Sequence, residues 1–212
     1  MDLLAQLADD VINGNDKGVA EVTQRVIDQG TSPKAILDDG LIAGMNVIGE
    51  RFRVHDIFLP DVLLAARAMY AGMDLLKPLL IKEGIPSIGK VVIGSVQGDL
   101  HDIGKNLVGI MLKGAGFEVI DLGNDVPPEK MVTTAQEQGA SVIGMSALLT
   151  TTMPVMGKVV DLIQQEGLSQ NIKTIVGGAP VSEDFARGIG ADAHGFDAAN
   201  AVDRVKSLMK VG

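Results

Sequence analysis

The sequence predicts an α/β protein in two parts: an N-terminal four-helix bundle, then a flavodoxin-like (Rossmann-like) domain built on a five-stranded parallel β-sheet. Residues 1–83 carry helical periodicity and helix-capping residues but no convincing strand. From Lys90 onward, short apolar runs alternate with segments of helical length, as in parallel strands joined by right-handed helical crossovers. Residues 84–89 contain glycine and proline and fit a linker, so we expect a helical cap domain at 1–83 and an α/β domain at 90–212.

The composition restricts both the partners and the chemistry of the chain. A net charge of -9 argues against nucleic acid as a partner. The absence of cysteine removes disulfides, thiolate-bound zinc and iron–sulfur clusters held by this chain. The start has acidic residues where a signal peptide would be basic, and the longest uncharged run, 138–157, is interrupted by glycines and Pro154. We therefore expect a cytoplasmic protein with no membrane partner.

Four helices are expected in the first part, and short connections between them favour a bundle of antiparallel neighbours. Each boundary is marked by a capping or helix-breaking residue. These residues are Asn13-Gly14 after the first helix (2–12), Asn15 or Asp16 before the second, Gly30 after it, Ser32 and Pro33 at the start of the third, and Pro60 at the start of the fourth. The last two helices are rich in methionine, which on composition alone fits core filling better than contact with a ligand.

Five strands and five helices are expected in the second part. The predicted strands are Lys90–Val96, Phe117–Leu122, Ala140–Ser146, Ile172–Gly177 and Ala191–Gly195, and the predicted helices are Lys105–Ala115, Pro128–Gln138, Met153–Glu166, Ser182–Arg187 and Ala198–Met209. This alternation suggests the strand order 2-1-3-4-5, with the switch point between strands one and three. Ligands of such sheets bind outside the carboxyl ends of the strands, at that switch point.

Polar and glycine-rich segments follow three of the predicted strands. They are Asp99-Leu100-His101 after strand one, Ser146 to Thr150 after strand three, and Gly177-Gly178 at the end of strand four. All three lie on the same edge of the sheet. Gly94 and Gly144 fall inside strands one and three, where glycine often marks the close approach of a ligand or backbone. Together they predict a narrow slot between strands for something long and flat.

Asp99 and His101 suggest a metal ligand with its supporting carboxylate, because imidazole is the commonest side-chain metal ligand and a carboxylate can fix its tautomer. An isolated Asp-x-His would more often be a histidine capped at the approach to a helix. A phosphate-binding loop is excluded: the spacing from Gly98 to Gly104 is one residue too long, and Asn106 replaces the required hydroxyl. A zinc site would need more ligands, although His194, on the same edge, leaves a two-histidine site open.

The pattern Asp99-x-His101-x-x-Gly104, Ser146-x-Leu148 and Gly177-Gly178 resembles the cobalamin-binding signature of methionine synthase, B12-dependent mutases and methyltransferase corrinoid proteins. Phe58-Leu59-Pro60, followed by the run 65–69, resembles the helical cap module that precedes this domain in methionine synthase. The two modules alone are similar to the corrinoid carrier subunits of methanol, methylamine, glycine betaine and methoxyaromatic methyltransferase systems. One departure is His194, where the family often has an aromatic residue.

The resemblance implies a corrinoid bound base-off and His-on. His101 would be the lower cobalt ligand, and Asp99 would hydrogen-bond its other ring nitrogen. Ser146 and Thr150 would contact the displaced nucleotide tail. The remaining cofactor-binding positions implied are Asp102, Ile103, Gly104 and Leu148 around the ligand loop, and Gly94, Gly144, Gly177 and Gly178 making room for the tail. Because the last two helices of the cap are rich in methionine and alanine, which offer a soft surface to a flat ring, we also expect Leu63, Met69 and Met73 to face the ring.

The resemblance also implies a carrier that is not catalytic alone. Cob(I)alamin would accept a methyl group at a substrate:corrinoid methyltransferase, and methylcobalamin would deliver it at a corrinoid:thiol or corrinoid:tetrahydrofolate methyltransferase. A separate reductive activase would restore oxidised cobalt. Two alternatives stay open: an adenosylcobalamin mutase small subunit, which would need a barrel for its substrate, and a cobalamin-sensing regulator, which would need an effector domain.

Overall fold

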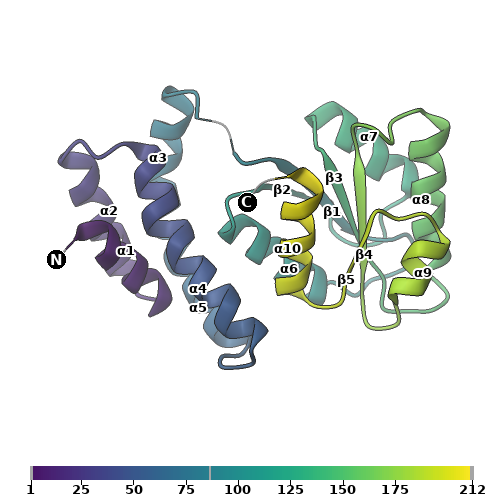
Figure 1. Ribbon diagram of the computed structural model, residues 1–212, viewed down its shortest axis with the longest axis horizontal. Coiled ribbons are helices and arrows are strands. Elements are labelled where there is room, and N and C mark those ends of the chain that lie inside the picture. The colour runs from purple at the N-terminus through teal and green to yellow at the C-terminus, as the bar shows by residue number, and fades with distance from the viewer. Residues whose placement is uncertain (1, 86, 211–212) are drawn as a thin grey trace. The chain divides into compact units, whose positions relative to one another are not determined.

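The computed structural model describes residues 2–85 and 87–210, so Pro86 of the expected linker lies outside the described residues. The chain divides into two compact units (Figure 1): a helical one that comprises the chain up to Ser87 together with Lys113–Gly116, and an α/β one that comprises Ile88–Leu112 and the chain from Phe117 onward. Within the described ranges, no helix is both long and apolar enough to cross a membrane. Each unit is built from its own sequence pattern and has its own core.

The helical unit contains the four expected helices. The first two are α1 (Leu3–Ile12) and α2 (Asp16–Asp28); the third is a continuous helix made of α3 (Pro33–Ala35), η1 (Ile36–Ile42) and α4 (Ala43–Arg53); the fourth is α5 (Leu59–Lys82). Side-chain oxygens cap three of them, because each accepts a backbone N–H of the first turn. Asn15 is the cap of α2, accepting from Gly18 at 3.1 Å, and Ser32 caps α3.

One feature of the third helix is not encoded in its apolar periodicity: η1 is a π-helical stretch of 7 residues. Gly40 and Gly44 lie on the side of this helix that packs against α1. A Cβ on Gly44 would come within 2.8 Å of the Ala8 carbonyl oxygen, so glycine permits this close crossing. The buried core of the unit is mainly aliphatic and includes Leu7, Val11, Val19, Val22, Val26, Ile36, Leu41, Ile48, Val62 and Leu76.

The α/β unit confirms the predicted parallel sheet and its strand order, β2-β1-β3-β4-β5. The strands are shorter than expected because their predicted ends lie in loops. They are β1 (Lys90–Ser95), β2 (Glu118–Asp121), β3 (Val142–Ser146), β4 (Lys173–Gly177) and β5 (Ala193–Gly195). The helices are α6 (Ile103–Gly114), α7 (Pro128–Gln138), α8 (Pro154–Gln165), α9 (Glu183–Gly188) and α10 (Ala198–Met209).

Helices cover both faces of the sheet, as a doubly wound fold requires (Figure 1). One face, carrying Ile143 and Val176, packs against α7, α8 and α9 in a continuous hydrophobic core. The other face packs against α6 and α10: a Cβ on Gly109 of α6 would touch Ile93, and one on Gly195 of β5 would touch Ala201 of α10. The strand register sets which side chains share a face, and this decides the geometry of the site.

Candidate functional site

The loop after β1 presents one imidazole to solvent and buries the carboxylate that holds it. The side chain of His101 is 52% exposed, whereas that of Asp99 is 0% exposed. The His101 Nδ1 lies 2.8 Å from Asp99 Oδ1, and the backbone N–H of His101 donates to the same oxygen at 3.1 Å. The ring is therefore fixed at Nδ1, and its Nε2 is the nitrogen left for a ligand.

Asp99 is ionised in this setting, and its charge determines the tautomer of His101. Burial by itself raises the pKa of Asp99. Hydrogen bonds from the Leu148 N–H, His101 and Thr152 outweigh that effect and hold the pKa well below its usual range. Because an ionised carboxylate only accepts hydrogen bonds, the proton of a neutral imidazole must sit on Nδ1. The Nε2 lone pair is then free to coordinate a metal, the usual role of a carboxylate behind a ligating histidine.

The segment after β3 supplies the remaining hydrogen-bond donors to the Asp99 carboxylate. Its Oδ2 accepts the N–H groups of Leu148 at 2.8 Å and Leu149 at 3.2 Å, and the Thr152 hydroxyl at 2.8 Å. Sequence reasoning missed Thr152 and named Thr150, whose side chain is exposed. The three consecutive threonines look alike in sequence, and only the turn that leads into α8 distinguishes the buried one. Leu148, which the resemblance assigns to the cofactor site, donates its backbone N–H to Asp99, and its side chain is exposed.

A second loop, between β2 and α7, supports the His101 loop from the other side. The Asp125 carboxylate accepts the Gly98 N–H at 2.7 Å, and the Asp125 N–H donates to the Asp99 carbonyl at 3.0 Å. The Asn124 side chain donates to the Leu100 carbonyl at 3.2 Å. Neither Asn124 nor Asp125 carried a signal in the sequence. Their role depends on the pairing of β1 with β2, which brings the two loops together.

The glycines expected to line one slot lie on opposite faces of the sheet, so the prediction that Gly94 makes room for a ligand together with Gly144 is wrong. In the register of β1 and β3, Gly94 pairs with Met145, whereas Gly144 pairs with Ile93. A Cβ on Gly94 would meet Met131 and Val126 at 3.0 and 3.1 Å, inside the core beneath α7. Gly94 therefore serves packing.

Gly144, Ser146 and Gly177 share the other face, the one covered by α6 and α10. All three are only half-buried, although they lie on strands in the interior of a parallel sheet, which are normally covered on both faces. Among the described residues, the Ser146 hydroxyl has no hydrogen-bond partner. This strip of small residues leaves the sheet partly uncovered at its carboxyl edge.

Gly178, which the resemblance assigns to the cofactor site, also allows two chain segments to cross. Its φ is +127°, and a Cβ there would lie 1.9 Å from the carbonyl oxygen of Ala147. The chain leaving β4 thus crosses directly against the chain leaving β3, and only glycine fits. This crossing fixes the segment that carries the N–H groups of Leu148 and Leu149.

Exposed apolar side chains flank the imidazole. Leu100 precedes His101 and Ile103 follows Asp102, and both apolar side chains are largely exposed. A Cβ on Gly104 would meet no atom within 4 Å, so the start of α6 is sterically open. An apolar surface around an exposed, oriented imidazole suits a ligand that is broad, flat and apolar as well as metal-bearing.

His194 does not join His101 in a metal site. Its Nδ1 lies 3.4 Å from Glu183 Oε2 on α9, and its side chain is nearly buried. The register pairs His194 with Val176, on the face packed by α7, α8 and α9. Across residues 2–85 and 87–210, no group of three or more His, Asp or Glu side chains could hold a metal ion. A metal at His101 would need its other ligands from a cofactor.

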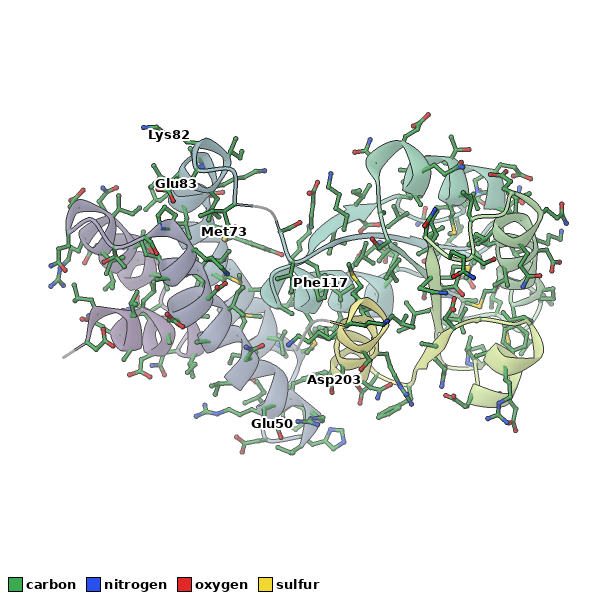
Figure 2. The ribbon with its side chains drawn as sticks, turned by 45° about the horizontal axis from the view of Figure 1, so that its top comes forward. Glu50, Met73, Lys82, Glu83, Phe117 and Asp203 are labelled. Carbon is green, nitrogen blue, oxygen red and sulfur yellow. The ribbon has the colours of Figure 1, made fainter. Side chains whose placement is uncertain are left out.

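The helical unit corrects one expectation about the cap. Met69 is 2% exposed and belongs to the core of the bundle, so it is not available to face a ring. Met73, labelled on α5 in Figure 2, is half-buried, and Leu63 on the same helix is exposed. A small error in the assumed phase of the helix accounts for this, because adjacent residues of a helix differ by 100° in direction.

Comparison with known proteins agrees with this architecture. A family model described as "B12 binding domain" matches residues 89–205, and a second model with the same description matches residues 3–77. Dimethylamine corrinoid protein 1 of Methanosarcina acetivorans is 43% identical over 209 residues, covering 98% of each chain. These matches span both units of the chain.

Two solved structures have the same fold over nearly the whole length. One is the methanol:cobalamin methyltransferase complex MtaBC from Methanosarcina barkeri, with a TM-score of 0.88, 32% identity, and coverage of 98% of this chain and 80% of that one. The other is a cobalamin-binding protein from Desulfitobacterium hafniense DCB-2, with a TM-score of 0.80, 34% identity and full coverage of both chains. The chain therefore belongs to the family of cobalamin-binding corrinoid proteins of methylamine and methanol methyltransferase systems.

Proposed function

We propose that this chain is a corrinoid carrier that binds cobalamin base-off and His-on and carries a methyl group between two methyltransferases. The observation that carries the proposal is the imidazole of His101, half-exposed and held at Nδ1 by a buried, ionised carboxylate. This is the arrangement that a single protein ligand to a cofactor-bound metal needs. The four equatorial ligands belong to the corrin, so one histidine suffices.

The displaced nucleotide tail fits the strip formed by Gly144, Ser146 and Gly177. These residues are half-buried on the face covered by α6 and α10, and Ser146 has a hydroxyl to offer. Gly104, and the exposed side chains of Leu100 and Ile103, offer an open apolar surface to the ring. Asp102, in the His101 loop, and Thr150, in the segment after β3, are proposed as peripheral contacts of the cofactor.

When bound, the corrin supplies a cobalt centre that accepts and releases methyl groups; the protein's part is ligation, orientation and access. Asp99 keeps the proton on Nδ1, so that Nε2 is presented as a neutral donor. In the helical unit, Leu63 and Met73 of α5 are proposed to shield the face of the ring opposite His101. The proposed partners are a substrate:corrinoid methyltransferase, a corrinoid:thiol or corrinoid:tetrahydrofolate methyltransferase, and a reductive activase.

The decisive experiment identifies the lower ligand by isotope. The full-length protein is produced with 15N-histidine, reconstituted with hydroxocobalamin and reduced to the cob(II) state. A protein imidazole below cobalt gives nitrogen splitting in the EPR spectrum that changes from a triplet with 14N to a doublet with 15N. A triplet that persists in the labelled protein means that the cofactor's own base is bound, and this would refute His-on binding.

The carrier role is tested separately. The loaded protein is mixed with methyltransferases encoded beside its gene, with methylamines or methanol as donors and a thiol or tetrahydrofolate as acceptor. Methyl transfer that requires both the loaded protein and a methyltransferase supports the proposal. Binding of cobalamin without transfer to or from any of these partners would favour a sensing role.

A further inference from the structure

We propose that Lys105 is a positioning residue for the His101 loop, acting through Asp121 and the loop between β2 and α7. Lys105 follows Gly104 directly, in the first turn of α6. Its side chain is only 4% exposed, unusual for lysine, and its ammonium group meets three oxygens. The Nζ donates to Asp121 Oδ1 at 2.7 Å, to Asp121 Oδ2 at 2.6 Å and to Asn106 Oδ1 at 2.6 Å.

Asp121 connects this buried cation to the neighbouring loop. It is the last residue of β2, and its Oδ1 also accepts the N–H of Gly123 at 2.9 Å. The Gly123 carbonyl in turn accepts the N–H of Ser95, and the Ser95 hydroxyl donates to the carbonyl of His101 at 2.6 Å. A chain of hydrogen bonds therefore runs from Lys105 to the backbone of His101, the proposed cobalt ligand.

The same loop holds the His101 loop at two further points. Asp125 bonds Gly98 and Asp99, and Asn124 bonds Leu100. Lys105 lies at the start of α6, directly after the His101 loop. Its contacts with Asp121 thus connect this segment to the loop between β2 and α7, which supports the His101 loop. Without the cation, the Asp121 carboxylate, which is 36% exposed, would turn to solvent and release Gly123.

The ion pair suits positioning better than stability. A charge pair adds little net stability over a well-packed apolar residue, whereas the two contacts from the Lys105 ammonium set the orientation of the Asp121 carboxylate. Lys105→Met keeps the buried aliphatic stem and removes only the cation, so the fold is expected to survive. The inference deepens the proposed function, since it concerns how the residues behind the proposed cobalt ligand are held.

The chain offers a matched control in Lys173. It forms an ion pair with Asp192, the residue before β5, with Nζ 3.5 Å from Asp192 Oδ1 and 2.7 Å from the Ser169 carbonyl. It lies at the start of β4, on the edge opposite the His101 loop. Lys173→Met should therefore lower stability without changing the imidazole.

The first readout uses the protein without cofactor. The chain has 3 histidines, so the 15N imidazole NMR spectrum is simple, and His101→Ala identifies the signal of His101. We expect Lys105→Met to shift or broaden the His101 resonances while those of His55 and His194 stay unchanged. Lys105→Arg keeps the charge and the hydrogen-bond donors, so its His101 resonances should lie closer to those of the wild type.

The second readout is affinity for hydroxocobalamin in the full-length protein. Lys105→Met should weaken binding about 10-fold, in the range seen for residues behind a metal ligand, and Lys173→Met should not. Asp121→Asn keeps one oxygen for Lys105, so its affinity for hydroxocobalamin should lie between those of Lys105→Met and Lys173→Met. It replaces Lys105→Met in the test if that variant fails to fold. The inference is wrong if Lys105→Met leaves both the His101 spectrum and the affinity as in the wild type. A wild type that does not bind cobalamin refutes the proposed function instead, and the NMR experiment still decides the role of Lys105.

Discussion

Replacing Asp99 by asparagine should reverse the tautomer of His101. The amide oxygen will occupy the Oδ2 position, because that site meets three donors, from Leu148, Leu149 and Thr152. The amide nitrogen must then take the Oδ1 position and donate to His101 Nδ1. The imidazole proton moves to Nε2, the atom proposed to ligate cobalt, and coordination requires it to leave again.

The cost in stability follows from the same contacts. The His101 N–H, which donates to Oδ1 at 3.1 Å, would face an amide donor and lose its partner. Hydrogen bonds to a charged group contribute about 1.5–3 kcal/mol and neutral ones about 0.5–1.5 kcal/mol, so the three kept at Oδ2 are weakened as well. Burying a neutral amide costs less than burying a carboxylate, which offsets part of this loss. We expect the free energy of unfolding of the cofactor-free protein to fall by about 2–4 kcal/mol.

Three measurements test this reasoning: urea unfolding of the cofactor-free variant, 15N chemical shifts of the His101 ring, and cobalamin affinity, which should fall by about 10–100-fold. Asp102→Asn is the control for the unfolding and NMR measurements only, because Asp102 is itself a proposed contact of the cofactor. It removes a carboxylate from the same loop, and no hydrogen bond joins that side chain to His101 among the described residues. An Asp99→Asn protein that keeps the proton on Nδ1 and binds cobalamin with wild-type affinity would refute the tautomer argument.

Four further outcomes are expected. His101→Ala should lower the stability of the cofactor-free protein by at most about 1–2 kcal/mol, because the ring is half-exposed, yet abolish histidine-derived splitting in the cob(II) EPR spectrum. Thr152→Val should cost about 1.5–3 kcal/mol in urea unfolding, while Thr152→Ser keeps the hydroxyl and should cost less; equal losses would mean that the hydroxyl bond is unimportant. Because the pKa of Asp99 is lowered by folding, its stabilisation is complete above its unfolded value of about 3.9 and declines as the pH falls below it. The stability difference between wild type and Asp99→Asn, measured without cofactor, should therefore narrow as the pH falls below about 4; a difference that widens below about pH 4 would contradict this sign. Leu63→Ala should accelerate photolysis of bound methylcobalamin, whereas Ile81→Ala, about 27 Å further along α5, should not; equal rates in both would argue against shielding by the helical unit.

The sequence was sufficient for the sheet, its order and the His101 loop, because alternating apolar runs and capping residues act locally. It was insufficient for which glycines share a face. Gly94 and Gly144 were assigned to one slot, but a shift of one residue in the register moves every side chain to the opposite face, and the register depends on distant pairing. The buried Thr152, 53 residues from Asp99, could not be told from its neighbours, because only the turn that leads into α8 turns its hydroxyl toward Asp99. The π-helical stretch near Gly40 was not predicted from the sequence, because its apolar spacing over one turn also fits an α-helix.

The shell of Asp99 also sets an order of events on the ribosome. The helical unit emerges first, and domains generally fold as units in the order of synthesis. His101 follows, but the donors that hold Asp99 on its other side belong to residues 148–152 and emerge only after β3. Until then the carboxylate has only part of its shell and the ring is not yet held in place. The nascent chain should therefore be unable to bind the corrinoid before the turn that precedes α8 has left the exit tunnel. Cofactor binding is then expected late in synthesis or after it.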